Sequence, residues 1–144
     1  GFASIGTVWS LYLKSFLGNN SYIGFPRNIV AGEALTAGQV VYHKAADSKW
    51  YKALGTAYVT VKGNLCLAVA NIALNATGVG LIVGGYRNDT LTWTAQNELW
   101  VSKATAGLIT DTQPATPAFV RNIGHAEAAS IAFFNGLATD ITEI

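Results

Sequence analysis

The chain has 144 residues, enough for one domain with a sizeable core. Hydrophobic residues make up 51% of it and charged residues only 12%, well below the usual charged share of about 25% in soluble domains. Its net charge of +1 comes from nine basic and eight acidic residues spread singly, which argues against a nucleic-acid partner and against an anionic membrane surface. With so few charges, we expect apolar surface that is covered by other copies or partners.

Other features exclude further classes. Cys66 is the only cysteine, so an intrachain disulfide and a cysteine-based zinc site are excluded, and we expect a small buried hydrophobe there. No stretch approaches the ~20 apolar residues of a spanning helix, so we expect a soluble protein with no membrane association. The absence of methionine, with Gly1 first, fits a product whose initiator was removed or a fragment of a longer chain.

The N-terminal residues differ from the rest of the chain. Four apolar residues recur at i, i+3, i+4 and i+7, which predicts one short helix. They are Trp9, Tyr12, Leu13 and Phe16. We therefore expect an N-terminal arm over residues 1–26. Because so short a helix is marginal in water alone, its aromatic stripe must lie on its own domain or on a neighbour, and these four residues are candidate interface residues.

Residues 27–144 have the pattern of a β-domain, with short branched and aromatic runs separated by Gly, Asn, Asp and Thr. The predicted strands are Val40–Tyr42, Trp50–Lys52, Tyr58–Lys62, Leu65–Ala70, Gly80–Tyr86, Leu91–Trp93, Leu99–Val101, Phe119–Ala126 and Ser130–Phe134. We therefore expect a mostly-β fold, a small antiparallel β-barrel or sandwich that follows a short helical arm.

Two neighbouring runs differ in their pattern. Residues 58–62 alternate, which predicts a strand with one wet face, whereas residues 65–69 are continuously apolar and should be covered on both sides. Gly63 and Asn64 between them are suited to a two-residue hairpin turn.

Glycine and proline mark two other places. Gly84 and Gly85 lie inside an apolar run, where glycine signals a bulge, a corner or a close backbone approach, and we favour a barrel corner. Residues 112–117 contain two prolines and no apolar cluster, so we expect a loop.

Catalytic patterns are absent from the sequence. His43 and His125 are the only histidines, neither lies in a recognisable motif, and the eight acidic residues are isolated from one another. We expect a non-enzymatic protein with no metal and no cofactor. An undetected hydrolase is the third and weakest hypothesis.

Aromatic residues allow two interpretations. Trp50, Tyr51, Trp93 and Trp100 have the large flat rings that stack on sugars, and rings of this size serve equally in a core or an interface. Because the tryptophans fall inside predicted strands, we favour a core or interface role. Trp93 and Trp100 are the candidate glycan-stacking residues of the alternative.

A series of turns and strand ends runs through residues 28–134. Its segments are Ala31–Tyr42, Lys49–Ala53, Gly84–Asp89 leading to Trp93–Thr94, Leu99–Ser102, Gly107–Thr110 and Val120–Ala126. This pattern, over about three-quarters of the chain, resembles a family of bacteriophage virion proteins: small β-barrel or β-tulip head-decoration (cement) proteins and related domains of phage fibres. The expected arm before Pro26 is not part of the pattern.

The resemblance implies a virion component that is not an enzyme and is commonly a homotrimer. The leading hypothesis is a capsid decoration protein that stabilises the head by binding between major capsid protein subunits. The alternative is a tail or head fibre domain that binds a host-surface glycan.

Overall fold

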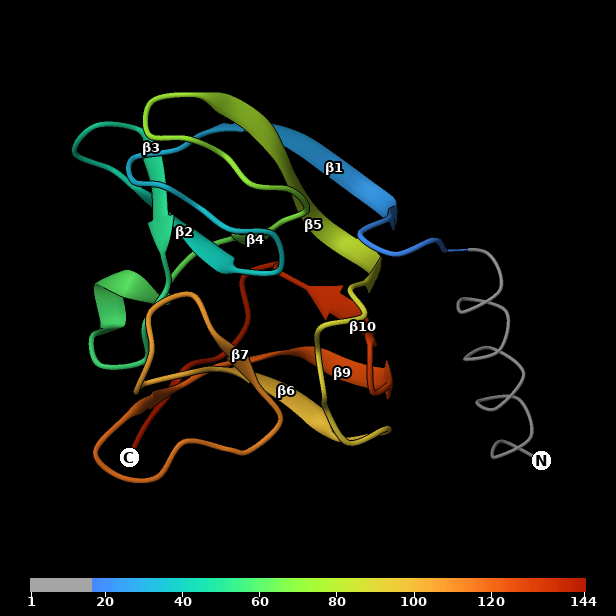
Figure 1. Cartoon of the computed structure of the whole chain (residues 1–144). Helices are drawn as coiled ribbons and strands as arrows, with labels where there is room; N and C mark the ends of the chain where they lie inside the picture. Colours follow the sequence, from blue (N-terminus) through green and yellow to red (C-terminus); the bar gives the residue numbers. More distant parts are fainter. Residues whose placement is uncertain (1–16) are drawn as a thin grey trace.

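The computed structural model describes residues 17–144 (Figure 1). The predicted helix and its residues Trp9, Tyr12, Leu13 and Phe16 lie outside the described residues. The described part is mostly β, as predicted, and has one short 3₁₀ turn, Tyr58–Thr60. Its strands are β1 (Tyr22–Val30), β2 (Val40–Lys44), β3 (Lys49–Lys52), β4 (Leu65–Ala68), β5 (Thr77–Arg87), β6 (Glu98–Val101), β7 (Ile109–Thr110), β8 (Phe119–Val120), β9 (Asn122–Ala128), β10 (Ile131–Asn135) and β11 (Thr142–Glu143).

Nine of these strands form one antiparallel sheet, in the order β3-β2-β4-β5-β10-β9-β6-β7, with β1 paired to β5. Strands β8 and β11 form a separate pair. The large sheet curls, so that β2 and β3 face β6, β7 and β9 across the molecule (Figure 1). Backbone hydrogen bonds join its two ends: Val40 N–H donates to Gly107 C=O at 3.0 Å, and Gly107 N–H donates to Ala53 C=O at 2.8 Å. The result is a curled half-barrel.

The core has two main apolar clusters, one on each face of the strands around β4. Leu65 and Leu67 point into the larger cluster, which fills the curl of the sheet, while Cys66 and Ala68 belong to the smaller one. Residues 65–69 are all buried, so the prediction that this run is covered on both sides is confirmed. Strand β2 divides its side chains in the same way, with Val40 in one cluster and Val41 in the other.

Strand β1 is the main element that the sequence did not predict. It continues through Pro26, so the boundary expected between residues 26 and 27 falls inside a strand. Proline is confined to edge strands because it cannot donate to a ladder, and β1 pairs with β5 alone among the described strands. Ser21 C=O accepts from Arg87 N–H and Ala31 N–H donates to Ala76 C=O, so the odd-numbered residues face β5. Pro26 therefore faces the free edge.

Residues 58–62 do not form the predicted strand, and Gly63-Asn64 is not a hairpin turn. Tyr58–Thr60 is a 3₁₀ turn in which the Thr60 hydroxyl donates to Leu54 C=O at 2.5 Å and to Ala57 C=O at 3.0 Å. Only Val61 of this segment is buried in the core. Local hydrogen bonds and one buried side chain thus replaced the strand, and β4 pairs with β2 and β5 instead.

Two other predicted strands change. Leu91–Trp93 is not a strand, because Asn88 Oδ1 accepts from the backbone and the hydroxyl of Thr90 and forms a turn. The predicted strand Phe119–Ala126 is divided at Arg121 into β8 and β9, which pair with different partners. The loop expected over residues 112–117 is confirmed, since no strand lies there.

The glycines of β1 and β5 mark a close approach of two backbones. Gly24 and Gly84 are directly opposite each other, with φ angles of +139° and +149°. A Cβ on Gly84 would lie 2.0 Å from Ile23 O. A bulge follows at once, because Phe25 pairs with Val83 and Pro26 with Leu81. The favoured corner at Gly84 is therefore a close backbone approach beside a bulge.

Candidate functional site

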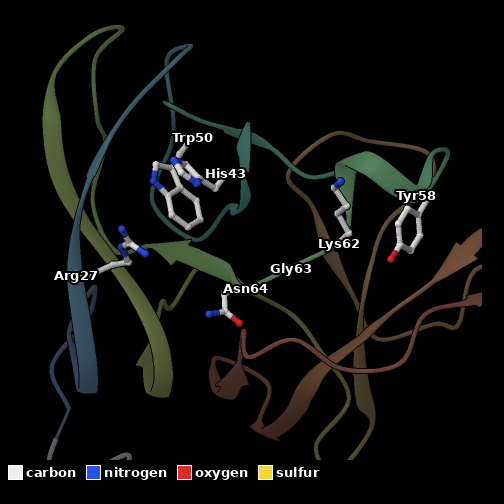
Figure 2. Close-up of a pocket in the computed structure, with 7 residues that line it drawn as sticks. All are labelled: Arg27, His43, Trp50, Tyr58, Lys62, Gly63 and Asn64. Carbon is white, nitrogen blue, oxygen red and sulfur yellow. The ribbon is translucent and has the colours of Figure 1, made fainter. Parts of the chain in front are cut away.

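A cleft of about 370 Å³ opens between two parts of the fold that the sequence did not connect. Figure 2 shows Arg27, His43 and Trp50 on one side of it and Lys62 and Tyr58 on the other, with Gly63 and Asn64 between them. Strand β1 supplies Arg27, and the β2–β3 hairpin supplies His43 and Trp50. The 3₁₀ turn supplies Tyr58, and the segment between that turn and β4 supplies Lys62, Gly63 and Asn64.

The cleft is basic. Arg27 and Lys62 line it, no acidic side chain does, and neither cation forms an ion pair with another described residue. Arg27 and Lys62 are both exposed, so their charged groups remain hydrated when the cleft is empty. Such an arrangement attracts an anion.

Trp50 forms the wall of the cleft beneath Arg27 and His43. The Arg27 Cζ lies 5.0 Å from the Trp50 ring centroid, and the His43 ring stacks on Trp50 with centroids 4.9 Å apart. His43 and Trp50 are cross-strand neighbours in the β2–β3 hairpin, which sets their contact. Trp50 is only 2% exposed, so its ring is not itself open to a ligand. Its role is to position the side chains of Arg27 and His43, which lie against the ring.

The segment between the two walls, Gly63-Asn64, is fixed from behind. Arg121 is fully buried and donates hydrogen bonds to four backbone carbonyl groups, those of Val61, Gly63, Gly136 and Leu137. Ala138 N–H donates to Asn64 Oδ1 at 2.8 Å. Burial lowers the pKa of Arg121 to about 10, since the charged form has lost its water. This segment is therefore held by a structural arginine and not by strand pairing.

A second candidate surface is an apolar face of the sheet where β1, β5 and β10 lie side by side. Phe25 is 72% exposed and Ile23 is 38% exposed, both on β1. Their cross-strand neighbours continue the row: Phe25 pairs with Val83, and Ile23 pairs with Gly85, which pairs with Phe133. We call Ile23, Phe25, Val83 and Phe133 the β1 face. Next to this face, Ile131 at the start of β10 packs against Leu17.

The two glycan-stacking candidates lie apart from this cleft. Trp93 is 8% exposed, belongs to the larger core cluster and donates its indole N–H to Ile109 C=O at 3.1 Å. Its ring is packed inside the protein, so it does not provide a sugar platform, in line with the favoured core role. Trp100 is half-buried in β6, opposite Thr110 and Asn122. Neither residue lines the cleft.

The other aromatic candidate, Tyr51, supports a turn. Its hydroxyl donates to the Asp47 carboxylate, and Lys44 Nζ lies 4.9 Å from its ring centroid. The hydrogen bond to Tyr51 lowers the pKa of Asp47 and raises that of Tyr51. Its ring also covers Gly32, where a Cβ would have no room.

The histidines are in unrelated places. His43 lines the cleft, whereas His125 on β9 contacts Glu127 Oε1 at 2.5 Å and stacks on Phe133. Glu127 is buried, so this contact fixes the orientation of the His125 ring. Within residues 17–144, no group of three or more His, Cys, Asp or Glu residues is placed to hold a metal ion.

Cys66 is fully buried in the smaller core cluster, as predicted. Burial raises the pKa of its thiol to about 12. The thiol therefore stays protonated and unreactive near neutral pH.

Sequence reasoning missed Arg27, Lys62, Tyr58 and Asn64 as a group. In the sequence Arg27 is one of nine basic residues spread singly, and the pattern of residues 58–64 predicts a strand followed by a hairpin turn. No spacing in the sequence joins β1 to residues 58–64, because only the curl of the sheet brings them to one cleft. One signal for the site was present in the sequence: Lys62 is followed by Gly63 and Asn64, and a basic residue in such a loop segment is expected at the surface.

Among residues 17–144, no helix has both the length and the apolar character needed to cross a membrane. Comparisons with known protein families and with curated proteins find no match to this chain.

Proposed function

We propose that this chain is a non-enzymatic virion structural protein that decorates a phage head, associates with copies of itself as a homotrimer and binds between major capsid protein subunits. The observation that carries the proposal is the β1 face, where Phe25 is 72% exposed on an edge strand. Large apolar side chains gathered on one face of a sheet are typical of a surface that another protein covers.

The position of Pro26 indicates how that contact is made. A free strand edge invites a second strand by backbone pairing, and proline at an outward position removes one donor from that edge. Pro26 faces outward in the middle of β1. A continuous ladder between two β1 strands is therefore disfavoured, and side-chain packing on the β1 face is the mode of association that the geometry favours.

The residues that carry the family resemblance have structural roles that agree with the proposal. In the segment Ala31–Tyr42, Leu35 bridges to Ile72, and Gly38 takes a φ of +90° in the turn before β2. Gly38 N–H donates to Ala68 C=O at 2.7 Å. The pattern that carries the resemblance therefore encodes the scaffold, which supports the proposal because one scaffold can present different binding surfaces.

A decoration protein acts by mass action: binding to the assembled shell shifts the equilibrium toward it. Many identical copies on a shell add avidity, so a face of a few apolar side chains is sufficient for each copy. The low charge of the chain suits such contacts.

The first test concerns self-association. We expect the protein to sediment as a trimer and Phe25→Asp to sediment as a monomer, because a charge buried at the contact is strongly disfavoured. Leu74→Asp is the matched control, since Leu74 is 58% exposed and lies away from the β1 face. A monomeric parent protein, or a Phe25→Asp variant that still forms the trimer, would count against the β1 face.

The second test concerns the location of the protein. Labelled antibody fragments against it should bind as regular clusters on the head in electron micrographs of the virion. Labelling confined to the tail would reject decoration and favour a fibre domain.

A fibre domain that binds a host-surface glycan is the second candidate function. The basic cleft favours it, because a small open cleft with charged and aromatic side chains suits a small polar ligand. Trp93 no longer contributes to this alternative, since its ring is buried.

A further inference from the structure

We propose that the cleft between Arg27 and Lys62 binds an acidic saccharide, a sugar ring that carries a carboxylate or sulfate group. The proposal rests on the geometry of the cleft and holds for a protein on a head or on a fibre. Its failure would therefore leave the decoration proposal standing.

The charges on the walls select an anion. Arg27 and Lys62 lie on opposite sides of the cleft, as Figure 2 shows, and the lining contains no carboxylate that would neutralise them. The planar guanidinium of Arg27 matches a carboxylate or sulfate in a two-point contact, and the ammonium of Lys62 adds a mobile point charge. An uncharged ligand would leave both cations without a partner.

Arg27 is ordered before a ligand arrives. Its guanidinium lies over the Trp50 ring, 5.0 Å from the centroid, and Trp50 in turn is packed in the smaller core cluster. Residues Gly63 and Asn64 are fixed by Arg121 and by Ala138 N–H. A preorganised site loses less conformational entropy on binding, which favours a specific small ligand over a diffuse electrostatic contact.

The remaining lining suits a sugar ring. Tyr58 is 53% exposed at the cleft, so part of its ring is open for the apolar face of a sugar. Asn64 uses its Oδ1 for Ala138 N–H, and its NH₂ group has no hydrogen-bond partner among residues 17–144. That amide and the ring nitrogens of His43 supply hydrogen bonds for hydroxyl groups.

Size and shape argue in the same direction. The volume of about 370 Å³ lies at the small end of the roughly 300–1,000 Å³ range of ligand sites. A nucleotide is a poorer fit, because Trp50, whose ring would complete a slot for a base, is buried. A nucleic-acid chain needs a longer basic track than two cations.

The test is a titration followed by amide resonances in ¹H–¹⁵N spectra of the full chain. The probes are glucuronic acid and 3′-sialyllactose as acidic sugars, lactose as the neutral sugar and adenosine monophosphate as the nucleotide. We expect the acidic sugars to shift the Gly63 and Asn64 resonances, lactose to bind at least roughly tenfold more weakly, and affinity to fall as salt rises.

Two charge variants and a control complete the test. Lys62→Gln and Arg27→Gln should each weaken binding of the acidic sugars by roughly tenfold or more, because each variant loses at least one charge-assisted hydrogen bond. Lys44→Gln changes the net charge equally and should bind as the parent does, because Lys44 lies over Tyr51 and does not line the cleft. Lys62 is exposed, so its variant tests the proposal even if Arg27→Gln loosens Trp50.

Three outcomes would overturn the proposal. They are equal affinity for lactose and the acidic sugars, binding of the nucleotide alone, and an equal effect of Lys44→Gln and Lys62→Gln. Self-association of the Lys62→Gln variant is measured alongside, and we expect it to be unchanged. That result separates this site from the β1 face.

Discussion

The buried guanidinium of Arg121 donates a hydrogen bond to the carbonyl oxygen of Gly63, so a charge with no exposed surface lies directly behind the basic cleft. The other carbonyl groups that it binds belong to Val61, Gly136 and Leu137. Arg121 thus joins two chain segments that no strand pairing connects. The shape of the cleft depends on this side chain together with the hydrogen bond from Ala138 N–H to Asn64 Oδ1.

Removal of that clamp is the first prediction. We expect Arg121→Met to lower the free energy of unfolding by roughly 3 kcal/mol, because buried carbonyl groups lose their donors. Arg121→Lys keeps a charge but has no planar fork to span four carbonyl groups, so it should lose stability too. Urea denaturation measures both. A Met variant as stable as the parent would mean that desolvation of the guanidinium cancels its hydrogen bonds.

The close approach of β1 and β5 gives the second prediction. Gly84→Ala should lower the free energy of unfolding by roughly 3 kcal/mol or prevent folding. The added Cβ would lie 2.0 Å from Ile23 O, and the backbone φ of +149° is unfavourable for alanine. Gly63→Ala is the control for backbone strain without a clash, because the φ of Gly63 is +74° but nothing lies within 4 Å of the added Cβ. We expect it to lower the free energy of unfolding by about 1 kcal/mol. If Gly84→Ala and Gly63→Ala lost equal stability in thermal denaturation, backbone strain alone, and not the clash with Ile23 O, would account for the loss at Gly84.

The raised pKa of Cys66 gives the third prediction, a loss of stability in alkali. The folded thiol has a pKa of about 12 and the unfolded thiol about 9, so its contribution is complete below pH 9 and is lost as the pH rises toward 12. The stability difference between the parent and Cys66→Ala should therefore shrink by about 1.4 kcal/mol per pH unit above pH 9. Denaturation curves at pH 8 and pH 10 measure it, and a constant difference would contradict the prediction.

The N-terminal boundary of the fold gives the fourth prediction. Leu17 is buried against Ile131, its carbonyl group accepts from Arg87 Nη1 at 2.8 Å, and Asn19 Oδ1 accepts from Asp89 N–H at 2.9 Å. Deletion of residues 1–20 should therefore lower stability by roughly 2 kcal/mol relative to deletion of residues 1–16, which keeps Leu17.

The same pair of deletions tests the aromatic stripe. If Trp9, Tyr12, Leu13 and Phe16 anchor the protein to a partner, the shorter deletion should abolish binding to the virion without a change in the melting temperature. Full occupancy of the virion by that deletion variant would reject the anchoring role.

The composition and the continuous apolar run at residues 65–69 were sufficient to predict an antiparallel β-fold with a doubly covered strand, because burial on both faces leaves a signal in the local sequence. Strand β1 was missed because Pro26 normally ends a strand, and only its place at the edge of the sheet makes the proline tolerable. Residues 58–62 alternate like a strand, but a single buried side chain, Val61, and the hydrogen bonds of Thr60 decided their conformation.

What the sequence alone determined is therefore the class of fold, the buried thiol of Cys66 and the absence of a recognisable catalytic motif, since each depends on local pattern or residue type. The tertiary structure decided which residues meet. Arg27 and Lys62 lie 35 positions apart, and their common cleft exists because the sheet curls and Arg121 holds the segment between them. Such long-range contacts depend on the register and curvature of many strands at once, which no single stretch of sequence encodes.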